Sequence, residues 1–190
     1  MDHSNPTPAT AAQDGPLDRL KADIAHFARR QDAVVSTGFL VRLFLLTPGF
    51  GFVLRRRLSE AAVAVPGIGR LLRRWIWART CVRYGSELAI STPIGGGLYV
   101  PHPFGIVVGH GRIGRDVTLL QGVTIGNVAG VDGRGTIVAD GCYIGAGAKV
   151  LGDIMLGEQA VVGANSVVRI DIPAGATAVG IPARILGRRT

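Results

Sequence analysis

Residues 137–178 read IVADGCYIGAGAKVLGDIMLGEQAVVGANSVVRIDIPAGATA, and an apolar residue returns there at every sixth position. The fifth position of each hexad holds only small or aliphatic side chains. A six-residue period does not fit an α-helix, because the apolar face would rotate steadily around the helix axis. The two series are Val138, Ile144, Val150, Leu156, Val162, Val168 and Ala174, and Cys142, Ala148, Ile154, Ala160, Ser166, Ile172 and Ala178.

This period predicts a solenoid of very short strands, in which three hexads close one triangular coil. Glycine suits the corners of such a coil, and successive coils stack about 4.8 Å apart so that their backbones can pair. The chain has 28 glycines but an aromatic content of only 6%, which fits small aliphatic core layers. The predicted fold class is therefore mostly β, a parallel β-helix.

The same period starts earlier in the chain and is interrupted once. Its earlier members are Val107, Ile113, Leu119 and Ile125, with Val117 and Val123 at the fifth position. Thirteen positions separate Ile125 from Val138, seven more than one hexad. The segment 127–137, NVAGVDGRGTI, therefore cannot join the strand ladder. We expect it to protrude as a loop, and long loops on rigid scaffolds commonly build sites.

The segment before the repeats has a different pattern and most of the positive charge. Apolar residues recur there at helical spacing, with breaks at TPGFG (47–51) and VPGIG (65–69). Between Arg29 and Arg83 there are eleven arginines against two acids. We expect helices that pack on the repeats or on a second copy, or that dock on an anionic membrane surface. Nucleic acid is not an expected partner, because no nucleic-acid motif accompanies the charge.

These patterns divide the chain into a disordered tail (1–16), a basic helical segment (17–84), a β-helix domain (85–187) and a short tail (188–190). Two cysteines, Cys81 and Cys142, are too few for a disulfide framework, and neither has a neighbour at metal-ligand spacing. We therefore expect a reduced setting and no metal. The N-terminus lacks the features of a secretory signal, and no apolar stretch reaches the roughly 18 residues of a spanning helix. A cytoplasmic location is expected, free or at the inner face of the membrane.

Three strings in the repeat region carry a family resemblance: IGAGAKVLG (144–152), VGANSVV (162–168) and VGIPARILG (179–187). They resemble the hexapeptide-repeat acyltransferases, specifically the serine acetyltransferase branch. The resemblance implies a left-handed β-helix and a homotrimer, or a dimer of trimers, with active sites in grooves between neighbouring subunits. It also implies that acetyl-CoA, the co-substrate, lies along those grooves.

The resemblance assigns the catalytic residues. Serine acetyltransferases use a histidine general base that an aspartate fifteen residues upstream orients. The matching histidine is His102, and Glu87 stands fifteen residues before it. A carboxylate bonded to one imidazole nitrogen fixes the tautomer and stabilises the imidazolium, so the dyad chemistry tolerates glutamate. His110 is the competing candidate for the base, or lines the acceptor pocket. We expect direct acetyl transfer without an acyl-enzyme.

The resemblance also indicates cofactor positions. Gly126, Asn127, Ala146 and Ala164 match family positions whose backbone meets the pantetheine arm, and Lys149 is a candidate for the phosphates of CoA. An ordinary coil corner or a solvated basic face is the alternative for each. A carbonic anhydrase on the same solenoid is not expected, because it needs three histidine ligands and only His102 and His110 lie in the repeats.

Two departures from the family concern the acceptor. The family has Asp before the base and an Arg-His pair in the loop, where this chain has Pro101 and Arg134-Gly135. Only Arg134 then remains as a carboxylate partner, which favours a neutral saccharide acceptor in polysaccharide synthesis over free serine. Serine O-acetyltransferase activity and a non-catalytic scaffold are the alternatives. The family also recruits a sulfhydrylase through a C-terminal isoleucine, and because this chain ends in GRRT we expect no such complex.

Overall fold

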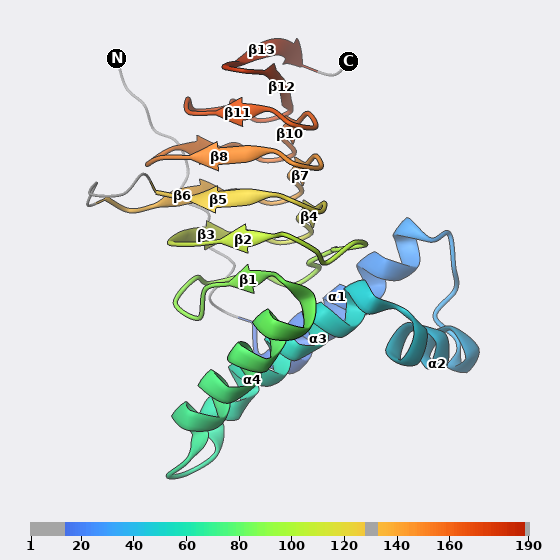
Figure 1. The fold of residues 1–190 in the computed structure, drawn as a ribbon. Helices are drawn as coiled ribbons and strands as arrows, with labels where there is room; N and C mark the ends of the chain where they lie inside the picture. Colours follow the sequence, from blue (N-terminus) through green and yellow to red (C-terminus); the bar gives the residue numbers. More distant parts are fainter. Residues whose placement is uncertain (1–13, 128–132, 189–190) are drawn as a thin grey trace.

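The computed structural model describes residues 14–127 and 133–188, and it has two layers (Figure 1). A group of helices forms the base, and a column of short strands rises from it as a β-helix. Of the expected tails 1–16 and 188–190, residues 1–13 and 189–190 lie outside the described residues, as does the loop segment 128–132; Pro16 begins the first helix and Arg188 ends the last strand. The prediction of a left-handed parallel β-helix that follows a helical segment is confirmed.

The base consists of four helices and one 3-10 turn within the described residues. Proline occupies the first turn of both α1 and α3, where its missing N–H costs no hydrogen bond. Gly85 ends α4 in the left-handed conformation, with φ 56°. The elements are α1 (Pro16–Arg30), α2 (Thr37–Leu46), α3 (Pro48–Ala61), the 3-10 turn η1 (Ala62–Ala64) and α4 (Gly69–Tyr84).

The strands form three faces of a triangular column. The first face has the order β1-β2-β5-β8-β11, the second β3-β6-β9, and the third β4-β7-β10-β12-β13. All pairs are parallel except β12 with β13, which fold back antiparallel at the top. The bounds are β1 (Glu87–Leu88), β2 (Val107–Val108), β3 (Gly111–Ile113), β4 (Thr118–Leu119), β5 (Thr124–Gly126), β6 (Thr136–Val138), β7 (Tyr143–Ile144), β8 (Lys149–Leu151), β9 (Met155–Leu156), β10 (Val161–Val162), β11 (Val167–Val168), β12 (Ala176–Gly180) and β13 (Ala183–Arg188).

The hexad frame predicts the core with two exceptions. Val107 is 43% exposed and Val108 fills its place inside, because the corner between β2 and β3 is one residue shorter than a hexad allows. Ala174 is exposed, because Leu156 pairs with Ile172, two residues earlier than the frame requires. All fifth-position residues, including Cys142 and Ser166, are buried. The expected loop ends at residue 135, since β6 starts at Thr136.

Two buried arginines of α3 close the bottom of the column. The first coil has no coil beneath it, so its downward-facing carbonyl groups lack strand partners. Arg56 donates to the carbonyl oxygens of Leu88, Ala89 and Thr92 at 3.2, 2.9 and 2.6 Å. Arg57 donates to those of Ile94 and Gly95 at 3.0 and 2.6 Å. The two guanidinium groups thus replace the missing backbone donors.

Carboxylates of the helices hold these arginines in place. Asp23 of α1 is fully buried, and Arg57 donates to its two oxygens at 2.8 and 3.1 Å. Asp23 also accepts from the backbone N–H of Leu98 at 2.8 Å, while Glu60 pairs with both arginines. Each buried charge therefore has an opposite charge and further hydrogen bonds, which its burial requires.

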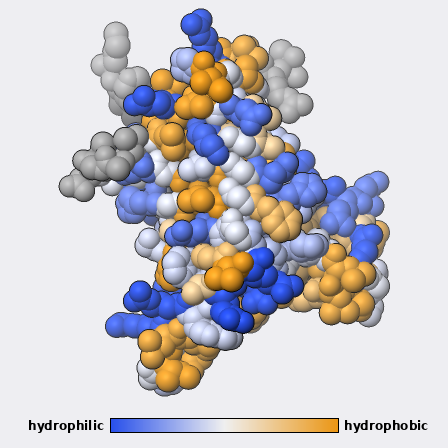
Figure 2. Space-filling view, in the orientation of Figure 1, coloured by the Kyte–Doolittle hydropathy of each residue, from blue (hydrophilic) through white to orange (hydrophobic). Residues whose placement is uncertain are grey.

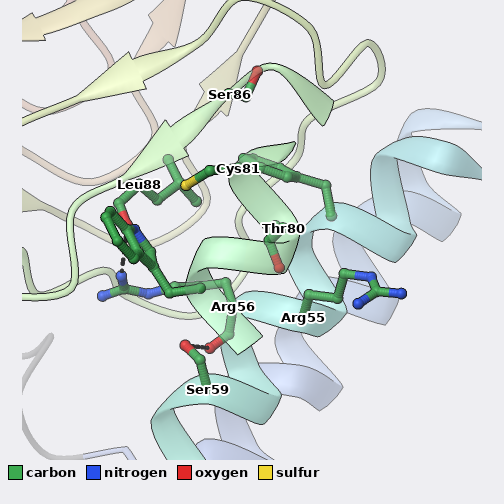
Figure 3. Close-up of a pocket in the computed structure, with 9 residues that line it drawn as sticks. Arg55, Arg56, Ser59, Thr80, Cys81, Ser86 and Leu88 are labelled. Carbon is green, nitrogen blue, oxygen red and sulfur yellow. Dashed lines mark hydrogen bonds between the residues drawn. The ribbon is translucent and has the colours of Figure 1, made fainter. Parts of the chain in front are cut away.

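A small cavity remains where α3 and α4 meet β1 (Figure 3). Arg56, Ser59, Cys81 and Ser86 are among the residues that line it, and its volume is about 10 Å³. This volume holds about one water molecule, so the cavity is not a substrate site.

Gly135 brings the expected loop back to the column in a conformation that favours glycine. Its φ is +78°, and a Cβ atom there would lie 2.8 Å from both the ring Cδ2 and the carbonyl oxygen of His110. The imidazole of His110 therefore occupies the space beside Gly135 that a side chain at position 135 would need.

Exposed apolar side chains gather on the helices. α2 and the tip that joins α3 to α4 are largely orange in Figure 2, and Leu45 and Leu46 are each 75% exposed. Among the described residues no single helix is long and apolar enough to cross a membrane. Only α2 together with the segment Pro48–Ala64 passes that test, and the pair is bent by 85°.

We expect Arg57→Met to lower the free energy of unfolding by about 3–5 kcal/mol, because it leaves the Asp23 carboxylate buried without its partner. Arg55→Met in the same helix is the control, since Arg55 is half-buried and lies outside the Asp23–Glu60 cluster. It should cost about 0.5 kcal/mol or less. Urea unfolding followed by circular dichroism measures both, and equal losses would show that the cluster does not hold the column on its base.

Gly135→Ala should destabilise the chain by about 2–4 kcal/mol, from left-handed backbone strain plus the clash with His110. Gly175→Ala is the matched control, because its φ is +69° and nothing lies within 4 Å of an added Cβ. It should cost about 1–2 kcal/mol. The double variant His110→Ala/Gly135→Ala should recover part of the stability that Gly135→Ala loses, because the clash with the imidazole is removed. An equal cost at positions 135 and 175 would contradict the assigned position of the His110 ring.

Candidate functional site

His102 lies at the corner between the third and first faces, in an exposed turn. The turn follows Tyr99, which pairs with Thr118 of the third face, and leads into β2 of the first face. Ser86 fixes this turn, because its hydroxyl donates to the carbonyl oxygen of Pro103 at 3.0 Å and accepts from the N–H of Ile106 at 2.9 Å. The His102 imidazole is therefore open to solvent on a backbone that the first coil holds.

Glu87 is the residue next to Ser86 and begins β1 on the first face. Its backbone N–H donates to the carbonyl oxygen of Ile106 at 2.7 Å, and it pairs in register with Val107. Its side chain is half-buried. Within residues 14–127 and 133–188, its carboxylate forms no hydrogen bond with His102. The structure thus ties the backbone segments of the two residues together through Ser86 and Ile106.

The corner that carries His102 continues upward as a regular column, which we call the His102 edge. Backbone N–H groups link its levels: Gly122 donates to Phe104, Gly147 to Gln121, and Asn165 to Ala146, at 2.9, 2.8 and 2.8 Å. Ala146 and Ala164 lie on this edge, one and two levels above Gly122. Four stacked coils span about 14 Å, which suits an extended ligand such as a pantetheine arm.

Lys149 lies on the first face beside the His102 edge. Its ammonium group donates to the carbonyl oxygen of Gly122 at 2.6 Å. The side chain is half-buried, so in this structure its ammonium group stabilises the corner at Gly122 instead of extending into solvent.

The remaining predicted residues lie at the opposite corner, between the first and second faces, which we call the loop edge. His110 follows β2 there; Gly126 ends β5 at the same corner one level higher, and Asn127 comes directly after it. Arg134 is exposed and donates through Nε to Asp153 at 3.1 Å. Its guanidinium thus forms an exposed ion pair with Asp153, and its expected role as a carboxylate partner for the acceptor stays a prediction.

The structure therefore separates the predicted residues into two groups. One group lies on the first face or at the His102 edge and consists of Glu87, His102, Ala146, Lys149 and Ala164. The other group lies at the loop edge and consists of His110, Gly126, Asn127 and Arg134. The two groups flank the same face of one chain. Together they would line one cleft only if the loop edge of one copy faced the His102 edge of another.

The cysteines are poor nucleophiles in this structure. Burial raises the pKa of the Cys142 thiol to about 12, and burial also raises the pKa of Cys81. Both thiols are therefore protonated near neutral pH. Among the described residues, no cluster of three or more His, Cys, Asp or Glu side chains is arranged to hold a metal ion.

Ser86, Arg56 and Arg57 support the site but do not stand out in the sequence. Neither the hexad frame nor the family strings include them, and their roles depend on carbonyl groups far away in the chain. The run of three arginines in an otherwise apolar helix is the one sequence feature that could have indicated buried, structural arginines. A solvated basic face explains such a run equally well.

The sequence matches one protein-family model and the sequences of several known enzymes. The family model described as bacterial transferase hexapeptide (six repeats) matches residues 135–169. A serine acetyltransferase of Mycobacterium tuberculosis is 35% identical over 147 residues, which are 68% of this chain and 64% of that protein. The chain therefore spans slightly less than two thirds of this relative's length.

Solved structures of serine acetyltransferases superpose on most of the chain. The soybean enzyme complexed with serine is 34% identical with a TM-score of 0.79, over 90% of this chain and 70% of that chain. The Brucella abortus enzyme in complex with coenzyme A is 29% identical with a TM-score of 0.79, over 92% and 68%. Because the likeness covers 90% of this chain in structure at 34% identity and 68% of it in sequence at 35% identity, this chain belongs to the hexapeptide-repeat acyltransferases, in the serine acetyltransferase-like branch.

Proposed function

We propose that the chain is an acetyl-CoA-dependent O-acetyltransferase and that L-serine is the acceptor of its acetyl group. The observation that carries the proposal is the exposed His102 at the foot of a regular edge, with Glu87 anchored beside its turn. The relatives named serine acetyltransferase, among them the soybean enzyme complexed with serine, support this activity.

The saccharide acceptor favoured by the sequence gives way to serine, its alternative. From the sequence, Gly135 is the loss of an acceptor-binding histidine. The structure supports a different view, because the imidazole of His110 lies directly against Gly135. An imidazole is therefore present at this corner even though position 135 lacks one, so the corner is less depleted of polar groups than the sequence suggested.

In the proposed reaction, His102 accepts the proton of the serine hydroxyl as that oxygen attacks the thioester carbonyl carbon of acetyl-CoA. The tetrahedral intermediate collapses, the carbon–sulfur bond breaks, and the proton passes from the imidazolium to the departing thiolate. Glu87 orients the imidazole and stabilises its charged form. Ala146 and Ala164 line the extended arm of acetyl-CoA, while Gly126 and Asn127 meet it from the loop edge of a neighbouring copy. A homotrimer supplies that neighbour.

His102→Ala should lower kcat by about 10²–10⁴ and leave the affinity for acetyl-CoA nearly unchanged, since it removes only proton transfer. Glu87→Gln should also be slower, but less so, because this residue orients the base. Glu158→Gln is the control for loss of a carboxylate, as Glu158 is exposed in the turn before β10. Turnover of acetyl-CoA with L-serine and calorimetric binding of acetyl-CoA measure these effects. Wild-type turnover in His102→Ala would remove this residue from the mechanism.

Mixing two inactive variants tests whether neighbouring copies share each site. If His102 of one copy works with Arg134 and His110 of the next, co-refolded His102→Ala and His110→Ala/Arg134→Ala chains form some sites that carry neither change. Random trimers should then regain about a quarter of wild-type activity. Each variant refolded alone is the control. A mixed trimer, confirmed by affinity purification through a tag carried by only one of the two variants, that gains no activity would contradict shared sites.

A further inference from the structure

The outer face of α4 carries a row of apolar side chains that no other element of the described chain covers. Its members recur at steps of four, three and four residues, so they lie one above the other on one side of the helix over about 16 Å. Leu71 is 71% exposed, Trp75 62% and Val82 83%, and Ala78 is exposed as well. We call these four residues the α4 stripe.

The opposite side of α4 is the one that packs on the protein. Thr80 and Tyr84 are buried there, and the ring of Tyr84 contacts that of Phe52 in α3 edge to face, with centroids 5.3 Å apart. The α4 stripe is therefore a second apolar face of the same helix, and it has no partner among the described residues. Scattered exposed apolar residues are ordinary, but a contiguous exposed face indicates an interaction surface.

The tip that joins α3 to α4 adds further apolar side chains. Val63, Val65 and Ile68 are exposed there, and Figure 2 shows the tip as an apolar patch at the bottom of the molecule. The apolar surface of this helical hairpin therefore includes its tip as well as the α4 stripe.

Arginines flank the α4 stripe on both sides. At 100° per residue, Arg70 and Arg74 lie on one side of it and Arg79 and Arg83 on the other. All four are exposed, and Arg70, Arg74 and Arg79 form no ion pair or hydrogen bond within the described part of the chain. Residues 61–86 contain no Asp or Glu. An uncovered apolar stripe is thus bordered by cations on a helix without a carboxylate.

This charge pattern distinguishes between the possible occupants. If the α4 stripe of a second copy packed against the first, Arg74 and Arg79 of each helix would take the flanking positions of the seam, where like charges repel. An anionic lipid surface instead offers negative charge to all the flanking arginines and an apolar boundary to the stripe. Amphipathic helices of this kind lie in the plane of the interface, with Trp near the headgroups and the arginine stems along the apolar face.

We propose that the α4 stripe and its flanking arginines dock the protein on the surface of a membrane that contains anionic lipids. In this contact α4 lies along the surface, and Leu71, Trp75 and Val82 enter the boundary between headgroups and acyl chains. The contact is peripheral, since no single helix in the described ranges is long and apolar enough to cross a membrane. It does not depend on the proposed function, because the α4 stripe contains none of the residues assigned to acetyl transfer.

Co-sedimentation of the full chain with lipid vesicles tests the role of charge. The protein should bind vesicles of phosphatidylcholine and phosphatidylglycerol at least about tenfold more tightly than vesicles of phosphatidylcholine alone, and Arg74→Gln/Arg79→Gln should lose about tenfold or more of that affinity. Arg169→Gln/Arg184→Gln is the matched control, because it removes the same charge from exposed positions at the top of the column and should bind as the wild type does. Equal binding to both kinds of vesicle, no binding to either, or equal loss in both variants would overturn the proposal.

The same assay tests the apolar residues. Leu71→Ser/Val82→Ser should weaken binding to the anionic vesicles about tenfold or more, since each side chain no longer leaves water for an apolar boundary. Leu45→Ser/Leu46→Ser is the control, because it removes two equally exposed apolar side chains from α2, outside the α4 stripe. Equal loss in the two variants would show that exposed apolar surface in general, and not the α4 stripe, drives binding, which contradicts the proposal.

Trp75 reports directly on the contact. The chain has two tryptophans, so Trp77→Phe leaves Trp75 as the only one. Its emission should move to shorter wavelength, and bromine-labelled acyl chains should quench it, when anionic vesicles are added. If Trp75 is already shielded from acrylamide before vesicles are added, another copy of the chain covers the α4 stripe and the membrane proposal is wrong.

Discussion

The structure depends on how the lowest coil of the column is closed. A β-helix pairs every coil with the next, so its first coil must present unpaired backbone groups to whatever lies below. Here Arg56 and Arg57 donate to five of those carbonyl oxygens, and Asp23 accepts from the N–H of Leu98. The helical base is thus part of the hydrogen-bonding system of the column rather than a separate layer.

This closure bears directly on the proposed chemistry. Glu87 belongs to the same first coil, and Arg56 donates to the carbonyl groups of the two residues that follow it, Leu88 and Ala89, as well as to that of Thr92. Ser86, just before Glu87, fixes the turn that carries His102. Catalytic geometry must be kept within a fraction of an ångström, so the hydrogen bonds that fix the first coil would serve the proposed chemistry as well as the fold.

The arginines of the helical segment lie in two different environments. Arg56 and Arg57 are buried, satisfied and structural, whereas Arg70 and Arg74 are exposed and unpaired among the described residues. Both groups contribute equally to the net charge of +8. The net charge therefore overstates how much positive charge this segment offers to an anionic partner, because Asp23 and Glu60 neutralise the charges of Arg56 and Arg57.

The sequence by itself determined the column, because a six-residue period of aliphatic side chains has few other solutions. The six-residue frame predicts burial wrongly at Val107 and Ala174. At these two places a corner or a coil is shorter than the period, and only the backbone pairing shows the shift. The family strings indicated His102, Glu87 and the positions expected to meet acetyl-CoA. Tertiary structure alone decided the rest: the pairing of Arg134 with Asp153, the imidazole of His110 beside Gly135, and the two arginines beneath the first coil. These contacts join residues far apart in the chain, and no local pattern encodes which distant group a side chain will meet.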